Sequence, residues 1–391
     1  MAEPTAPRED HRPGLSFAGV FAVTFCGLVG VGSVLPVLPR YVHGPLDHGD
    51  IAVGIVIGAY AATGLLLRPV AGRLADTRGR KPTVLVGALL VALSGFLYLP
   101  SLGLAGLIAA RLVLGAGEGA VYTAGSVWIV DLAPAERRGR VLGLYGLAVW
   151  GGLSVGPLLG ELLLDQGGYD AVWIFAAAMP LLGALIALVA RDPFVPLEHA
   201  EPHPLIAPEA VGPGFAIALA SLGYAAVATF IVLHLEARGI GHGAAVFGAF
   251  AAMIVLARLV LGDLPDRVGA APVAIAATLG EAAGLGLIAV AHSLPVALAG
   301  GMVMGAAFSL LNPSLMLIAL GRVSQEARGA AMGTYTAFFD AGVGLGAPLA
   351  GLVAALAGYE AAFLFAAAVS VAAAAMIALS RRRPRPGVIA R

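Results

Sequence analysis

Long apolar segments alternate with short polar ones along almost the whole chain. Twelve of the apolar segments approach the ~20 residues that an α-helix needs to cross a bilayer. Gly and Ala are abundant inside them, and such small residues let membrane helices pack closely. The pattern predicts an all-α integral membrane protein with twelve transmembrane helices. The segments are 15–38, 51–71, 83–100, 104–130, 140–164, 171–190, 214–236, 243–262, 271–291, 295–320, 329–356 and 360–380.

The composition supports a bilayer as the solvent. The chain is 59% hydrophobic and 12% charged, with a mean hydropathy of +0.92, whereas a soluble domain carries roughly 25% charged residues. The formal net charge is zero, so nothing indicates binding to nucleic acid. The one cysteine, Cys26, excludes an intrachain disulfide and is interpreted as a packed residue. We expect the first apolar segment to be a retained helix and not a signal peptide.

A pattern in the first half of the chain recurs in the second. The segment Arg68–Gly79 matches Arg258–Gly269, and the shift between them is about half of the chain's length. Gly168–Ala171 recurs at the same shift as Gly358–Ala361. Three glycines also correspond at this shift, namely Gly143, Gly152 and Gly156 with Gly333, Gly342 and Gly346. We therefore expect two parallel six-helix repeats.

Arg and Lys gather on one side of the predicted membrane. They fill alternate loops and both tails, whereas the opposite side has only Arg40 and Arg238. Because basic loops stay in the cytoplasm, both termini are predicted to be cytoplasmic. The expected organisation is a cytoplasmic tail at 1–14, six-helix halves at 15–190 and 214–380, a cytoplasmic linker at 191–213 and a basic cytoplasmic tail at 381–391.

The loop after the second predicted helix is short and strongly basic. It reads Gly72-Arg-Leu-Ala-Asp76-Thr-Arg-Gly79-Arg80-Lys81-Pro82. This motif and its echo resemble the loop between helices 2 and 3 of major facilitator superfamily transporters, and its weaker copy between helices 8 and 9. The resemblance covers nearly the whole chain and implies the major facilitator fold. It also implies a cytoplasmic gate formed by Gly72, Asp76, Gly79, Arg80, Asp131, Gly262 and Asp266. The alternative is a solvated loop whose charges only set the topology.

The fifth predicted helix carries regularly spaced small residues, which form a groove for a neighbouring helix. Its glycines and proline closely resemble the signature of the drug–proton antiporter branch, where this seam closes the outer half against leak. The matching residues are Gly143, Gly152, Gly156, Pro157 and Gly160. Glu161 stands where the signature has a final glycine, which is a departure from the branch.

The fourth predicted helix holds charged residues at membrane depth. Arg111 and Glu118 lie near one face of it, ~10 Å apart along the axis at 1.5 Å per residue, and Tyr122 follows Glu118 by one turn. Charged groups in membrane helices are costly and usually line a cavity. Arg111 resembles the family's helix 4 arginine, which is associated with proton transfer. We predict Glu118 as the first proton or substrate-cation site; the alternative is a structural Arg–Glu interaction.

Two further acids lie in predicted helices of the second half. Asp340 has Phe338 and Phe339 beside it, which suits an amphipathic ligand, and Asn312 interrupts helix 10. We include Asp340 and Asn312 in the proton and substrate site. Glu281 is a candidate for the same site, but the ninth helix is usually peripheral in this fold, so we favour a structural role for it.

The first function hypothesis is a proton-coupled exporter of a small amphipathic neutral or cationic compound, working by rocker-switch alternating access. The predicted helices hold three acids at membrane depth but only one arginine, Arg111, and this excess of negative charge disfavours an anionic substrate. The second is a proton-coupled importer of a sugar, an organic acid or a siderophore-like solute. The third, a membrane enzyme or receptor, lacks a cluster of catalytic residues.

Neither a cofactor nor a metal is expected. No phosphate-binding loop is present, and His199 and His203 have no further ligands near them in the sequence. We expect a monomer in the bacterial inner membrane, with protons, a small-molecule substrate and the lipid bilayer as its partners. Drug resistance is the biological role that this interpretation suggests.

Overall fold

The structure, a computed structural model, describes residues 13–133, 138–192, 207–321, 323 and 328–380. All regular secondary structure among these residues is α-helical. The basic tail at the C-terminus, nearly all of the N-terminal tail and most of the predicted linker, including His199 and His203, lie outside the described residues.

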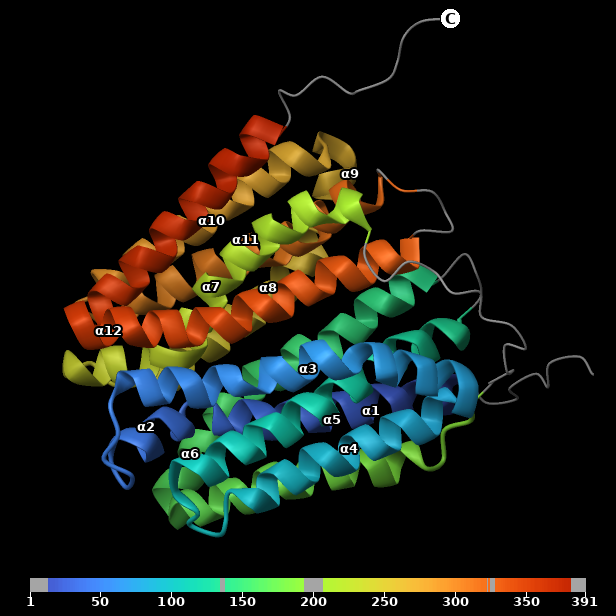
Figure 1. The fold of residues 1–391 in the computed structure, drawn as a ribbon, viewed down its shortest axis with the longest axis horizontal. Helices are drawn as coiled ribbons and strands as arrows, with labels where there is room; N and C mark the ends of the chain where they lie inside the picture. Colours follow the sequence, from blue (N-terminus) through green and yellow to red (C-terminus); the bar gives the residue numbers. More distant parts are fainter. Residues whose placement is uncertain (1–12, 134–137, 193–206, 322, 324–327, 381–391) are drawn as a thin grey trace, which may run out of the picture. The chain divides into compact units, whose positions relative to one another are not determined.

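Long helices make up almost all of the described chain (Figure 1). They are α1 (Pro13–Val34), α2 (Val37–His43), α3 (Asp50–Arg78), α4 (Arg80–Leu97), α5 (Gly103–Asp131), α6 (Arg138–Ala187), α7 (Pro208–Ala237), α8 (Gly243–Leu261), α9 (Leu264–Val268), α10 (Ala270–Ala289), α11 (Leu294–Leu320) and α12 (Arg328–Ser380). Ten of the described helices are long and apolar enough to cross a membrane.

Two of these helices are long enough for two crossings each. Helix α6 has 50 residues and α12 has 53, so each spans about 75 Å or more at 1.5 Å per residue, against a hydrocarbon core of about 30 Å. Each changes direction at a glycine with positive φ, 66° at Gly168 and 85° at Gly358. Residues with a Cβ rarely adopt this conformation. Each helix therefore contains two of the predicted segments, and the predicted all-α fold is confirmed.

The chain divides into two compact units. Unit 1 comprises residues 1–46 and 59–201, and unit 2 comprises residues 47–58 and 202–391. The first turns of α3, up to Gly58, are thus grouped with unit 2. There the Tyr359 hydroxyl donates a hydrogen bond to Asp50 Oδ1 over 3.0 Å.

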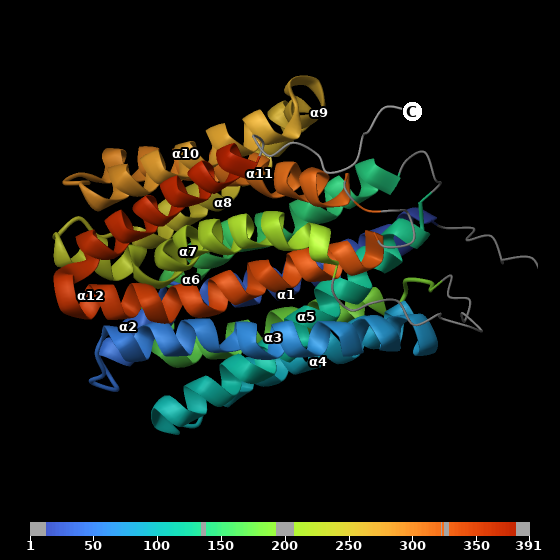
Figure 2. The ribbon, with the colours of Figure 1, turned by 45° about the horizontal axis from the view of Figure 1, so that its top comes forward.

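Each unit has one pair of helices in extensive contact, α1 with α6 in unit 1 and α7 with α12 in unit 2. The views in Figures 1 and 2 both show α7 running beside the first part of α12. A Cβ added at Gly156 would lie 2.7 Å from Val29 O on α1, and one at Gly346 would lie 3.0 Å from Leu222 Cα on α7. Since these two glycines occupy equivalent positions of the sequence repeat, the repeat corresponds to one packing arrangement used twice.

Candidate functional site

In unit 1 the polar residues at membrane depth gather where α3 crosses α5. Glu118 is partly exposed, and Tyr122, one turn later, is 42% exposed. The Arg68 guanidinium lies over the Tyr122 ring, with its carbon 5.3 Å from the ring centroid. Such a cation–π contact is favourable when water is excluded. Sequence analysis named Arg68 only as the first residue of the repeated segment and did not include it in the site.

Small residues on α5 let this arrangement form. A Cβ at Gly115 would overlap Tyr60 O on α3, and one at Gly119 would lie 3.5 Å from Arg68 Cγ. The Thr63 hydroxyl, also on α3, donates to Leu112 O over 2.6 Å. The two helices therefore meet backbone to backbone, which brings the Arg68 side chain across α5.

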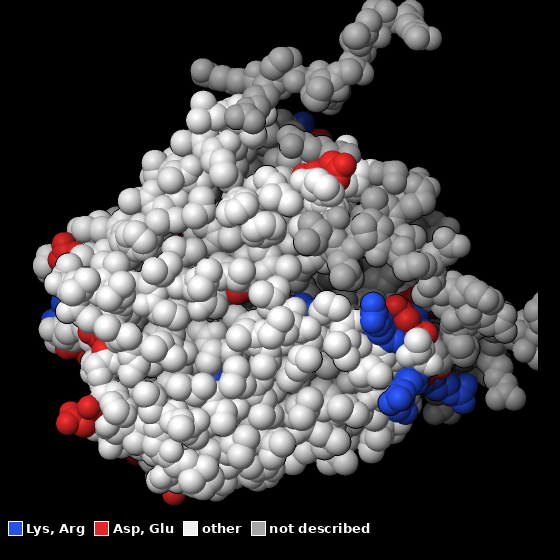
Figure 3. All heavy atoms as spheres, in the orientation of Figure 1, with Lys and Arg blue, Asp and Glu red and all other residues white. Residues whose placement is uncertain are grey.

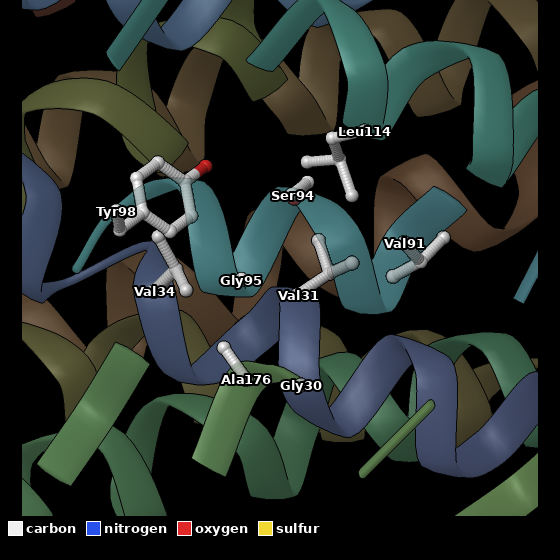
Figure 4. A pocket seen from close by; sticks show the side chains of 9 residues that line it. All are labelled: Gly30, Val31, Val34, Val91, Ser94, Gly95, Tyr98, Leu114 and Ala176. Atoms are coloured by element: carbon white, nitrogen blue, oxygen red, sulfur yellow. The ribbon is translucent and has the colours of Figure 1, made fainter. Parts of the chain in front are cut away.

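Arg111 lies deeper in unit 1 than Glu118. It is 1% exposed, and its guanidinium carbon is 4.9 Å from the centroid of the Tyr60 ring. A small pocket lies nearby, and the side chains of Tyr98 and Leu114 are among those that line it (Figure 4). Its lining is apolar apart from Ser94 and the Tyr98 hydroxyl. The structure thus assigns Arg111 to the packed interior and Glu118 to a more open face.

In unit 2 polar residues of α8, α11 and α12 form two hydrogen-bonded groups. The Tyr335 hydroxyl lies 3.1 Å from Asn312 Oδ1 and 3.2 Å from Asn312 O. Arg258 donates to Ser309 O over 3.3 Å, and the Ser309 hydroxyl donates to Ile254 O over 2.8 Å. Asp340 lies on α12, 5% exposed and about one and a half turns after Tyr335.

The polar residues of the two units occupy equivalent positions of the sequence repeat, but their acids do not. In the sequence repeat, Arg258, Asn312 and Tyr335 are equivalent to Arg68, Tyr122 and Tyr145. The position that corresponds to Glu118 is Phe308, and the position that corresponds to Asp340 is Trp150. At the first pair of positions unit 1 has the acid and unit 2 the aromatic residue. At the second pair unit 1 has the aromatic residue and unit 2 the acid.

In unit 2, aromatic rings surround Phe308. The Phe308 ring lies 5.9 Å from that of Tyr224, 6.0 Å from that of Phe250 and 6.4 Å from that of Phe339. Phe338, by contrast, packs against Phe215 at the start of α7, at 4.8 Å. Of the two phenylalanines that precede Asp340, only Phe339 belongs to this aromatic cluster.

The segment predicted as a basic loop is helical except at Gly79, because α3 runs to Arg78 and α4 begins at Arg80. This basic loop forms a network with parts of unit 1 that are distant in the sequence. Arg80 Nε lies 3.0 Å from Asp131 Oδ2, and Arg80 Nη2 lies 3.8 Å from Asp76 Oδ1. These are the residues that the family resemblance placed together. Figure 3 shows basic side chains gathered near the end of α3, while the visible surface along the helices is almost uncharged.

Sequence reasoning missed the hydrogen bonds between this loop and the residues that follow α6. The backbone N–H of Lys81 donates to Asp192 Oδ2 over 2.8 Å, and Lys81 Nζ donates to Leu188 O at 2.6 Å and Ala190 O at 2.8 Å. Gly79, with φ of 107°, passes close to the same carboxylate. Asp192 therefore caps α4 from 111 residues away, although sequence analysis assigned it to the linker.

Replacing Asp192 by Ala is expected to lower the stability of the protein by about 1 kcal/mol, because a helix N-terminus loses its acceptor. Asp192→Asn keeps an oxygen at this position and should cost less. Thermal unfolding in detergent, followed by intrinsic fluorescence, measures both. Equal melting temperatures for Asp192→Ala and the wild type would contradict this role.

The echo of the loop in unit 2 is built differently. Asp266 is exposed in the short helix α9, and the neighbouring Asp263 pairs with Arg267, which lies one turn away and is also exposed. The positions that correspond to Arg80 and Asp131 hold Ala270 and Gly321. Gly262 and Asp266 therefore stand without an equivalent of the Arg80–Asp131 ion pair.

The glycines of the predicted seam divide into two groups. A Cβ at Gly152 would lie 2.8 Å from Phe25 O, and one at Gly160 would overlap Ser33 O, so both press against α1. Pro157 lies within the same helix contact, beside Gly32. An added Cβ at Gly143, however, meets nothing within 4 Å. Glu161, the departure from the signature, pairs with Arg40 at 3.1 Å.

The remaining candidate, Glu281, is 0% exposed and lies in α10 against Gly223 of α7. Among the described residues, no group of three or more His, Cys, Asp or Glu could hold a metal ion.

Solved structures share this fold. The nucleoside transporter NupG aligns with a TM-score of 0.77 and 15% identity, covering 94% of this chain and 100% of that chain. The human organic anion transporter TETRAN aligns with a TM-score of 0.73 and 18% identity, with the same coverage. At these identities the likeness concerns the fold alone.

Sequence relatives are closer. Residues 20–264 and, separately, 214–390 match the family model described as Major Facilitator Superfamily. An uncharacterized MFS-type transporter of Pseudomonas aeruginosa is 37% identical over 399 residues, with 98% of each chain covered. Another, of Burkholderia mallei, is 34% identical over 385 residues, covering 96% of this chain and 93% of that one. The chain belongs to the Major Facilitator Superfamily and is therefore a multi-pass membrane transporter and not an enzyme.

Proposed function

We propose that this transporter is a proton-coupled exporter of a small amphipathic compound, neutral or cationic, in the drug–proton antiporter branch. Its two halves would rock about a central site, and the exchange of a proton for substrate would drive the cycle. The protein would lie in the bacterial inner membrane with both termini in the cytoplasm, as a monomer.

The observation that carries this proposal is the presence of one acid at membrane depth in each unit, Glu118 in unit 1 and Asp340 in unit 2. Each unit also has an arginine at equivalent positions of the sequence repeat, Arg68 or Arg258. Ionisable groups at this depth are costly and mark ion or substrate pathways. Aromatic rings near Asp340 suit a ligand with an apolar body and a positive charge.

The same proposal gives the basic loop a role as the cytoplasmic gate. The Arg80–Asp131 ion pair and the nearby Asp76 would hold the loop in one conformation and release it in the other. The seam of Gly152, Gly156, Pro157 and Gly160 against α1 would keep the outer half closed to protons. Gly143 contributes no contact there and has no role in the seam in this proposal.

The direction of coupling is tested with proteoliposomes that are acidic inside. An antiporter takes up a fluorescent lipophilic cation from outside while protons leave, and collapse of the gradient by an ionophore stops the uptake. A control with protein-free vesicles corrects for passive partition of the cation. Failure to accumulate such cations, combined with proton-driven movement of a sugar or organic acid in the same direction as the proton, would instead establish the importer.

A further inference from the structure

One acid of unit 2 lies outside the polar set around Asn312 and Tyr335. Glu281 is in the middle of α10, and its side chain is 0% exposed. It falls on the face of the helix whose other buried members recur every three or four residues, namely Ala274, Ala277, Thr278, Gly284, Leu285 and Ile288. Such a face packs against other helices, so Glu281 occupies a position where the pattern calls for an apolar side chain.

The two carboxyl oxygens of Glu281 are both buried, and neither has a hydrogen-bond partner among the described residues. Buried polar groups in folded proteins are almost always paired. The hydroxyl of Thr278, one turn away, donates to Ala274 O of its own helix and is thereby occupied.

Glycines make the room for this carboxyl group. A Cβ at Gly223, on α7, would lie 2.5 Å from Glu281 Oε1 and 2.9 Å from Leu285 Cδ1. A Cβ at Gly284 would lie 2.7 Å from Gly300 O, so α10 and α11 are in close contact one turn farther along. The carboxyl group is therefore enclosed by backbone and apolar side chains.

The titratable side chains on the helices around α10 are engaged elsewhere or lie apart from Glu281. Helix α11 has none, and those of α9, Asp266 and Arg267, are exposed. On α7, Glu209 and Glu236 are exposed near the two ends of the helix. Tyr224 stacks on Phe308, and a ring nitrogen of His234 lies 3.0 Å from Ile288 O near the end of α10. On α12, Tyr335 forms a hydrogen bond with Asn312, Tyr359 forms one with Asp50, and Glu360 forms an ion pair with Arg238. Asp340 makes no hydrogen bond to Glu281. No cation of the described residues forms an ion pair with Glu281.

We propose that Glu281 is a proton-binding site and that it is a neutral carboxylic acid in this conformation. An ionised carboxylate without partners in a membrane interior is far more costly than the protonated form. The proton leaves only when the contact between Gly223 on α7 and α10 opens and water reaches the carboxyl group. Occupation of this site is a property of the resting protein, so it goes beyond the exporter proposal and does not depend on it.

Infrared spectroscopy of the purified full-length protein in lipid, at neutral pH in heavy water, detects the proton directly. A protonated carboxyl group gives a C=O stretching band that is separate from the carboxylate bands. The spectrum of the wild type minus that of Glu281→Gln should contain such a band, and this component should remain in the matched control Asp340→Asn. A difference spectrum without this band would overturn the proposal.

Thermal unfolding at a series of pH values provides the second measurement. Unfolded Glu titrates near 4.3, so at neutral pH folding takes up a proton at Glu281, and stability falls as the pH rises. The melting temperature of the wild type should therefore fall relative to that of Glu281→Gln between about pH 5 and pH 8. Parallel curves for the two proteins would contradict a proton at this site. A transport defect without these changes would concern the exporter proposal alone.

Discussion

Replacing Glu118 by Gln is expected to reduce proton-driven transport to the level of protein-free vesicles. Gln keeps the size and polarity of the side chain but can no longer take up or release a proton. Glu118 is partly exposed and lies one turn before Tyr122, over whose ring the Arg68 guanidinium lies. Downhill movement of substrate without a pH gradient should remain, because it requires no titration of this residue.

Glu161→Gln is the matched control for this variant. Glu161 is also an acid of unit 1, but it forms an ion pair with Arg40 at 3.1 Å, with both side chains partly exposed. Gln keeps an oxygen that can accept a hydrogen bond from Arg40, so this variant should transport nearly as well as the wild type. Uptake driven by an imposed pH gradient measures both variants. Full coupling in Glu118→Gln would remove Glu118 from the mechanism.

Replacing Gly160 by Ala is expected to destabilise the protein strongly, by about 1–3 kcal/mol or more. The added methyl group would overlap the carbonyl oxygen of Ser33, which is backbone and cannot turn away as a side chain could. Helices α1 and α6 would have to separate, and the transporter should lose thermal stability in detergent.

Gly143→Ala in the same helix should have the opposite result. Its added methyl group meets nothing within 4 Å, and Ala is favoured over Gly in a helix by roughly 0.5–1 kcal/mol. The melting temperature of this variant should equal or exceed that of the wild type. Similar losses in both variants would show that contact with α1 does not distinguish these glycines.

The fold was predictable because its determinants are local or repeated. The length of each apolar segment indicates a membrane helix, and the match between Arg68–Gly79 and Arg258–Gly269 shows that one unit occurs twice. The difference between Gly143 and Gly152 was also present in the sequence. Nine positions are about two and a half turns of a helix, so these two glycines lie on opposite faces, whereas Gly152, Gly156 and Gly160, spaced by about one turn each, share one.

The contacts that join distant parts of the chain were not predictable in this way. Asp192 caps α4 across 111 residues, and Arg68 reaches Tyr122 only because α3 and α5 pack closely at Gly115. Both depend on how one helix is rotated and shifted against another, which the hydrophobic pattern does not specify. The interior position of Glu281 on its helix was visible in the pattern, but its enclosure by Gly223 was not.

The central claim is that substrate and proton exchange through Glu118 and Asp340. Its most direct test is proton flux from proteoliposomes that are acidic inside, read with a pH-sensitive dye while lipophilic cations, antibiotics, sugars and organic acids are added one at a time. We predict that amphipathic neutral or cationic compounds trigger proton release in the wild type, and that Glu118→Gln and Asp340→Asn abolish it while Glu161→Gln does not. Proton release that is unchanged in both acid variants would contradict the account, and so would the absence of release with these compounds while a sugar or organic acid moves in the same direction as the proton.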